Sequence, residues 1–151
     1  MLKRAALRPD CLVIGIGNPL RGDDGVGALL AEQVGGLSVQ QLTPELAADL
    51  APLQRVLFID AWLAPQQPGP LPQPRLDPLP AVSPGVGSGT SHHLDPAQLL
   101  AITTALYGRA PSAFWLRIPA HSFSHGREFS PGLQASLPAA RRLLRCWLVE
   151  A

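Results

Sequence analysis

The sequence predicts an α/β fold in which a parallel sheet is covered by helices on both faces. Short apolar runs alternate with amphipathic segments, which is the pattern of strands joined by crossover helices. The run at 55–61 is almost unbroken in apolar residues, as is typical of a strand buried on both faces. With 151 residues, of which 46% are hydrophobic and 15% charged, the chain is long enough to bury a real core.

The first half of the chain is expected to contain three strands and two helices. The strands are predicted at Cys11–Gly17, Leu37–Leu42 and Arg55–Ala61. The first helix, Gly25–Val34, has apolar residues at helical spacing and is followed by a glycine pair that stops it. The second helix is expected to open with Thr43 as N-cap and Pro44 at the first helical position.

Prolines crowd residues 62–90, so a strand at Leu71–Leu79 is possible only at a sheet edge, because proline has no N–H for the ladder. We expect Pro65–Pro84 to form one wall of a substrate cleft. Three more elements are predicted: a helix from Asp95-Pro96 to about Tyr107, a strand at Ala113–Pro119, and a last helix from Ser130-Pro131. Pro138 should kink or restart that last helix.

The composition argues against several classes of function. The net charge is +1 without a basic block, so neither nucleic acid nor a membrane surface is expected as a partner. No run of about 18 apolar residues predicts a transmembrane helix, and no apolar core of a signal peptide precedes the first strand. Cys11 and Cys146 have no metal or disulfide spacing. We expect a monomeric, cytoplasmic protein with one domain over residues 1–151, of which 1–10 form a loose leader.

A glycine-rich turn between the first strand and the first helix carries two adjacent carboxylates, Asp23 and Asp24. A dinucleotide fingerprint would need a third glycine where Leu20 stands, and a phosphate loop would need Gly-Lys-Ser/Thr. Two negative charges would also repel a phosphate from the helix N-terminus. The turn is therefore better suited to a cation or to acid–base chemistry, although one of the aspartates could simply cap the helix.

Further candidate residues follow the strands at the same sheet edge. Asp60 ends the third strand, and ligands of open parallel sheets bind beyond the carboxyl ends of strands. If the first and third strands are neighbours, Asp24 and Asp60 meet there, and a histidine from the pair His92 and His93 could join them. Two carboxylates and an imidazole suit nickel, zinc or a similar divalent ion. The alternatives are that Asp60 holds a neighbouring loop and that the histidines are solvated.

The spacing Gly15-x-Gly17-Asn18-x-Leu20-x-x-Asp23-Asp24-Gly25-x-Gly27 resembles the signature of the hydrogenase maturation endopeptidases. These enzymes remove a C-terminal extension from the large subunit of [NiFe] hydrogenase after nickel insertion. The resemblance spans roughly residues 11–148 and implies a three-layer α/β/α sandwich with a mostly parallel, twisted five-stranded sheet of the phosphorylase-like kind. Three segments are most similar to the branch serving bidirectional, NAD(P)-linked hydrogenases: Leu42–Leu46, His92–Pro96 and Phe123–Gly126.

The resemblance also implies a site and a partner. Asp24, Asp60 and His93 take the positions of the metal-contacting residues, and the nickel is carried by the large-subunit precursor rather than held by the protease. Either the metal polarises the scissile carbonyl, or Asp24 or Asp60 acts as general base toward water. His121 and His125 are expected in a loop or on a partner surface.

One departure from the family pattern concerns the second strand. Relatives commonly carry Asp-Gly-Gly at its end, where this chain has Gln40–Glu45, and Glu45 is the residue that could substitute. Two other functions stay open: a non-catalytic assembly chaperone that binds the metal or the precursor, and a small-molecule hydrolase or phosphorylase. The absence of a phosphate cradle disfavours a phosphorylase, and no Gly-x-Ser-x-Gly or His-Glu-x-x-His motif is present.

Overall fold

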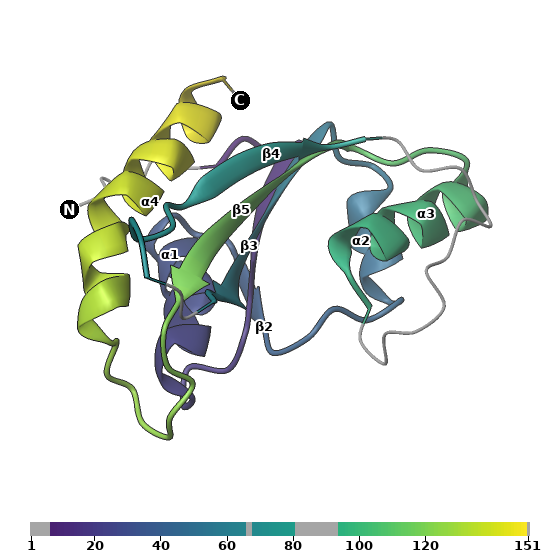
Figure 1. Cartoon of the computed structure of the whole chain (residues 1–151). Coiled ribbons are helices and arrows are strands. Elements are labelled where there is room, and N and C mark those ends of the chain that lie inside the picture. Colours follow the sequence, from purple (N-terminus) through teal and green to yellow (C-terminus); the bar gives the residue numbers. More distant parts are fainter. Residues whose placement is uncertain (1–6, 66–67, 81–93, 151) are drawn as a thin grey trace.

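The structure, a computed structural model, describes residues 7–65, 68–80 and 94–150, and these form a five-stranded sheet between two layers of helices (Figure 1). The strand order is β2-β1-β3-β5-β4. The bounds are β1 Cys11–Ile16, β2 Leu37–Val39, β3 Arg55–Leu63, β4 Arg75–Leu79 and β5 Ser112–Ala120. All neighbouring strands are parallel except β4, which is antiparallel to β5 at the edge. The predicted α/β fold is confirmed, with the first and third strands adjacent and the second outside the first.

Helices cover both faces of the sheet. The bounds are α1 Val26–Gln33, α2 Leu46–Leu50, α3 Pro96–Tyr107 and α4 Pro131–Glu150, and a 3-10 turn, η1 Gly22–Gly25, precedes α1. Figure 1 shows α1 and α4 on one side of the sheet and α2 and α3 on the other. Each face has its own core: Leu57 and Trp147 are fully buried on the α1–α4 side, and Phe58 and Leu99 on the α2–α3 side. Consecutive residues of β3 thus supply both cores, which explains its continuous apolar sequence.

Two glycines of the signature let α1 lie directly on the sheet. A Cβ on Gly15 would collide with the main-chain carbonyl of Gly27 and would lie 2.8 Å from the Cβ of Ala31. A Cβ on Gly27 would lie 2.5 Å from the Ile59 carbonyl oxygen and 2.8 Å from that of Ile16. The glycines therefore serve close strand–helix packing, which places η1 at the carboxyl ends of β1 and β3.

The largest differences from the predicted element boundaries are at the second strand and the second helix, and the third strand runs two residues further than predicted, to Leu63, so that Asp60 lies within it. The second strand ends at Val39 rather than Leu42, and Leu42 instead makes an isolated antiparallel bridge with Leu94. The helix α2 begins at Leu46 without a side-chain cap, so the prediction of Thr43 as N-cap was wrong. The carbonyl of Thr43 accepts a bond from the N–H of Leu46 three residues later (3.1 Å), so the chain makes a tight turn before α2.

Other boundaries agree with the predictions. Asp95 caps α3 in a capping box with Gln98, the two bonds measuring 2.8 and 2.9 Å. The proline-containing strand β4 lies at the edge, as expected for a strand that holds Pro78. The last helix does not restart at Pro138, because α4 is continuous and buries residues such as Leu133 and Leu144 on both sides of it.

The start of the described chain is attached to the sheet. Leu7 packs against the α1–α4 core, and the carbonyl of Asp10 accepts bonds from the N–H groups of Gln54 (2.8 Å) and Arg55 (3.2 Å). Residues 1–6 of the predicted leader lie outside the described residues. Within the described residues, no helix is both long and apolar enough to cross a membrane.

Candidate active site

A cavity of about 660 Å³ lies at the carboxyl ends of β1 and β3, and both predicted carboxylates, Asp24 and Asp60, line it. Asp24 comes from η1 and Asp60 from β3. The polar lining also includes Asn18, Arg21, Gln40, Gln41 and Asp95, and the larger apolar side chains are Ile16, Leu42, Leu63, Leu94, Trp115 and Phe123. The structure thus brings together two residues that are 36 positions apart, as the predicted strand order requires.

Asp24 is oriented by its own turn. Its Oδ2 accepts a hydrogen bond from the N–H of Asn18 at 2.9 Å, and the Asn18 Oδ1 accepts one from the N–H of Leu20 at 2.9 Å. Gly17 has a φ of 137°, and a Cβ there would collide with the main-chain oxygen of Asp24. The turn therefore needs glycine at 17 and asparagine at 18 to hold the Asp24 carboxylate at the cavity.

The carboxyl group of Asp60 has a pKa well above its ordinary value. Burial raises the pKa of its carboxyl group to about 7, against the opposing effect of a 2.9 Å hydrogen bond from the N–H of Ala61. The nearby charge of Asp24 raises that pKa further. A carboxyl group with a pKa near neutrality can both accept and release a proton under physiological conditions, which suits general acid–base chemistry.

Asp23 is fully buried and has a role that its sequence position does not indicate. Its Oδ1 accepts a bond from the N–H of Ser130 (2.7 Å), and its Oδ2 accepts bonds from the N–H groups of His121 (2.7 Å) and Ser122 (3.0 Å) and from the Ser130 hydroxyl (2.6 Å). Burial alone would raise the pKa of Asp23, but these bonds hold it below its ordinary value. Asp23 therefore fastens the loop 121–130, which carries Phe123 to the cavity.

His121 and His125 do not line the cavity of Asp24 and Asp60. The ring of His121 lies against Gly132, where a Cβ would come within 2.5 Å of its Cδ2. His121 also lines a second cavity of about 440 Å³, whose other lining residues come from the proline-rich stretch: Pro65, Pro68, Gly69, Pro70, Leu71 and Pro72. The residues of the predicted Pro65–Pro84 wall that line this second cavity therefore border His121, and none of the described residues of the wall lines the cavity of Asp24 and Asp60.

The third predicted metal-contacting residue, His93, lies outside the described residues, as does His92. Leu94, which follows His93 in the sequence, lines the cavity of Asp24 and Asp60. Among the described residues, no group of three His, Cys, Asp or Glu side chains is placed to hold a metal ion. At the departure from the family pattern, Gln40 and Gln41 line the cavity, whereas Glu45 is exposed and does not.

Comparison with known proteins gives matches among solved structures. No family model and no curated protein sequence matches the chain. The hydrogenase maturating endopeptidase HybD from E. coli is 17% identical, with a TM-score of 0.65 over 93% of this chain and 92% of that one. The [NiFe] hydrogenase maturation protease HycI from Thermococcus kodakarensis KOD1 is 21% identical, with a TM-score of 0.61 over 91% and 89%.

A third match is the hydrogenase 2 maturation peptidase from Thaumarchaeota archaeon SCGC_AB-539-E09, which is 20% identical, with a TM-score of 0.59 over 89% of this chain and 94% of that one. These matches are α/β proteins that align with this chain over about nine tenths of both lengths. The chain has the fold of the hydrogenase maturation endopeptidases, and the fold that the sequence resemblance implied is confirmed.

Proposed function

We propose that the protein is an endopeptidase that removes the C-terminal extension of a [NiFe] hydrogenase large-subunit precursor after nickel insertion. The observation that carries the proposal is the placement of Asp24 and Asp60 in one cavity, at the sheet edge where ligands of such folds bind. The match of the fold to maturation endopeptidases supports the same reading. The signature that resembles this family forms the turn that holds Asp24.

In this proposal the nickel ion belongs to the substrate. Asp24, Asp60 and His93 contact it and so distinguish a loaded precursor from an empty one. Carboxylates and imidazole are suitable ligands for such an ion. Leu94, which follows His93 in the sequence, forms an isolated antiparallel β-bridge with Leu42. Both leucines line the cavity, so the chain directly after His93 lies at the site.

Asp60 supplies the proton transfer. In its ionised form the carboxylate accepts a proton from the attacking water through an oxygen that the metal does not occupy, and it returns that proton to the leaving amine. Asp24, whose carboxylate is held by the Asn18 N–H, binds and orients the substrate-borne metal or the water. Trp115 and Phe123 belong to the apolar lining of the cavity, which limits the access of water to the C-terminal segment of the bound precursor.

We propose a monomer that acts in the cytoplasm on a hydrogenase of the bidirectional, NAD(P)-linked branch. The two cysteines support a reducing compartment, since Cys11 and Cys146 are both free thiols. The segments around Leu42 and Leu94 that carry the resemblance to this branch both line the cavity.

Intact-mass analysis of the precursor tests the proposed function. The purified protein is incubated with its hydrogenase large-subunit precursor in nickel-loaded and nickel-free form. We expect loss of a C-terminal peptide from the loaded form alone. Stable binding of the loaded precursor without a change of mass would favour the assembly chaperone, and cleavage of both forms would contradict recognition through nickel.

A further inference from the structure

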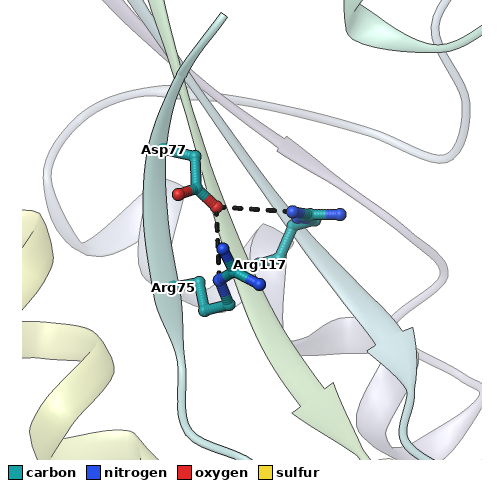
Figure 2. Close-up of polar contacts among 3 residues, drawn as sticks. All are labelled: Arg75, Asp77 and Arg117. Atoms are coloured by element: carbon teal, nitrogen blue, oxygen red, sulfur yellow. Dashed lines mark hydrogen bonds and ion pairs between the residues drawn. The ribbon is translucent and has the colours of Figure 1, made fainter.

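Two arginines on the neighbouring strands β4 and β5 share one carboxylate (Figure 2). Arg117 of β5 lies 3.3 Å from Asp77 of β4, measured from Nη2 to Oδ2, and the Nε of Arg75 lies 3.5 Å from the same oxygen. Figure 2 shows both guanidinium groups facing that carboxylate. We call these three residues the arginine cluster. It carries one positive charge in excess.

The arginine cluster is unfavourable as a purely structural device. Arg75 and Arg117 are directly opposite each other in the antiparallel ladder, where like charges destabilise the pairing. A charged edge strand discourages edge-to-edge association, but one arginine paired with Asp77 would serve that purpose. Asp77 offsets part of this repulsion, but a single carboxylate leaves the second positive charge of the arginine cluster without a partner of its own within the cluster.

Arg117 of the arginine cluster lies next to Asp60 across the sheet. Asp60 and Arg117 are register partners on β3 and β5, so their side chains leave the same face of the sheet. Trp115 leaves this face two residues earlier and lines the cavity. The Arg117 guanidinium lies over the Trp115 ring at 4.8 Å from its centroid. A chain that passes the paired carboxylates and crosses Trp115 therefore reaches Arg117.

Arg117 has binding capacity that Asp77 does not use. A guanidinium has five N–H donors, and the bond to Asp77 occupies Nη2 alone. The Nε of Arg117 is buried and has no hydrogen-bond partner among the described residues. The side chains of Arg75 and Arg117 are 64% and 35% exposed, and because the Nε of Arg117 is buried, a ligand reaches that guanidinium through its remaining Nη donors. Carboxylates are the groups that such forked donors recognise best.

We propose that Arg117 and Arg75 bind a carboxylate of the peptide substrate and thereby set specificity near the scissile bond. This inference rests on the proposed peptidase function. Neighbouring strands are about 4.8 Å apart and an extended peptide advances about 3.4 Å per residue, so the carboxylate lies within about three residues of the scissile bond. It belongs to an acidic side chain or, when the extension is short, to the C-terminus of the precursor.

Enzyme variants test the arginine cluster. For Arg117→Gln we expect KM for the nickel-loaded precursor to rise at least about tenfold, with kcat within about twofold. Arg117→Lys should recover part of the loss, because it keeps the charge without the fork. Arg55→Gln is the matched control, since Arg55 also lies over a tryptophan, Trp147, at 4.5 Å, but stands at the opposite end of β3. It should leave KM unchanged.

Substrate variants test the same contact without altering the enzyme. Once the scissile bond is mapped by mass, acidic residues within three positions of it are changed to amides. In a second precursor the C-terminus is extended by four glycines, which moves the terminal carboxylate away. One of these changes should raise KM for the wild type about tenfold and have little further effect in Arg117→Gln. This result also identifies the source of the carboxylate.

The outcomes separate this inference from the proposed function. Efficient cleavage with an unchanged KM in Arg117→Gln would overturn the arginine cluster as a binding site and leave the peptidase intact. Fluorescence anisotropy with labelled, nickel-loaded precursor measures binding without cleavage. If the wild type binds but does not cleave, and Arg117→Gln weakens binding about tenfold, the peptidase fails and the cluster stands. If Arg117→Gln binds as tightly as the wild type, the cluster is overturned.

Discussion

Replacing Asp23 with asparagine should lower the free energy of unfolding by about 2–4 kcal/mol. The buried carboxylate accepts four hydrogen bonds, all from the segment 121–130. An amide has one acceptor oxygen, so if that oxygen takes the three bonds of Oδ2, the NH₂ group meets the N–H donor of Ser130. A bond to a charged group contributes about 1.5–3 kcal/mol, and the remaining bonds lose the assistance of the charge.

Urea unfolding followed by far-UV circular dichroism measures this effect. The transition midpoint should fall with an unchanged m-value, and the corresponding fall in Tm should be about 5–12 °C. Asp24→Asn is the matched control, because the Asp24 side chain accepts a single bond among the described residues, from the N–H of Asn18. It should cost less than about 1 kcal/mol. A change in the unfolding free energy of under about 0.5 kcal/mol for Asp23→Asn would refute the role of Asp23 in holding the loop 121–130 in place.

The Asp23 contribution should also depend on pH. Its bonds hold the folded-state pKa of Asp23 below the ordinary value of 3.8, so the folded state favours the ionised form. This stabilisation is present above about pH 4 and is lost as the pH falls through the lowered pKa. The difference in unfolding free energy between wild type and Asp23→Asn should therefore shrink in strong acid.

Three further results are expected. Since burial raises the pKa of Asp60 from 3.8 to about 7, wild-type stability should fall as the pH rises through that range; Asp60→Asn should remove this dependence and raise the unfolding free energy at pH 8 by up to about 4 kcal/mol, measured by urea titration at pH 4 and 8. His93→Ala should abolish nickel-dependent cleavage while His92→Ala retains most of it, and cleavage should decline below about pH 6.5 as imidazole is protonated; a dead His92→Ala variant would contradict the assignment. Gly15→Ala should cost about 3 kcal/mol or more in thermal unfolding, because its Cβ collides with the Gly27 carbonyl, whereas a stable variant would mean that α1 can move off the sheet.

Much of the fold was predictable from local patterns. The unbroken apolar run before Asp60 identified a central strand, and Asp95-Pro96 marked the start of α3 through cap chemistry that involves only neighbouring residues. The start of α2 was not predictable in this way. Thr43 and Pro44 are common at helix starts, but here their main-chain carbonyls close a tight turn and Leu46 begins the helix.

The site was predictable where it depends on strand order and not where it depends on distant contacts. Asp24 follows β1, and Asp60 lies in the second half of β3, which runs on to Leu63 instead of ending at Asp60 as predicted; parallel order still brings the two carboxylates to one edge. The partners of Asp23 lie 98 to 107 residues away, and no local signal distinguishes a fastening aspartate from a capping one. The pairing of Arg117 with Asp77 depends on the antiparallel register of β4, which the proline-rich sequence does not indicate.

The most direct test of the paired carboxylates is the intact mass of nickel-loaded precursor after incubation with wild type, Asp24→Asn, Asp60→Asn and Asp49→Asn. Asp49 is an exposed carboxylate on α2, outside the cavity, and serves as the control. We expect the wild type and Asp49→Asn to release the C-terminal peptide at equal rates. Asp24→Asn and Asp60→Asn should leave the precursor uncut while keeping the wild-type circular dichroism spectrum. Cleavage at the wild-type rate by both cavity variants would contradict the assignment of this cavity as the active site.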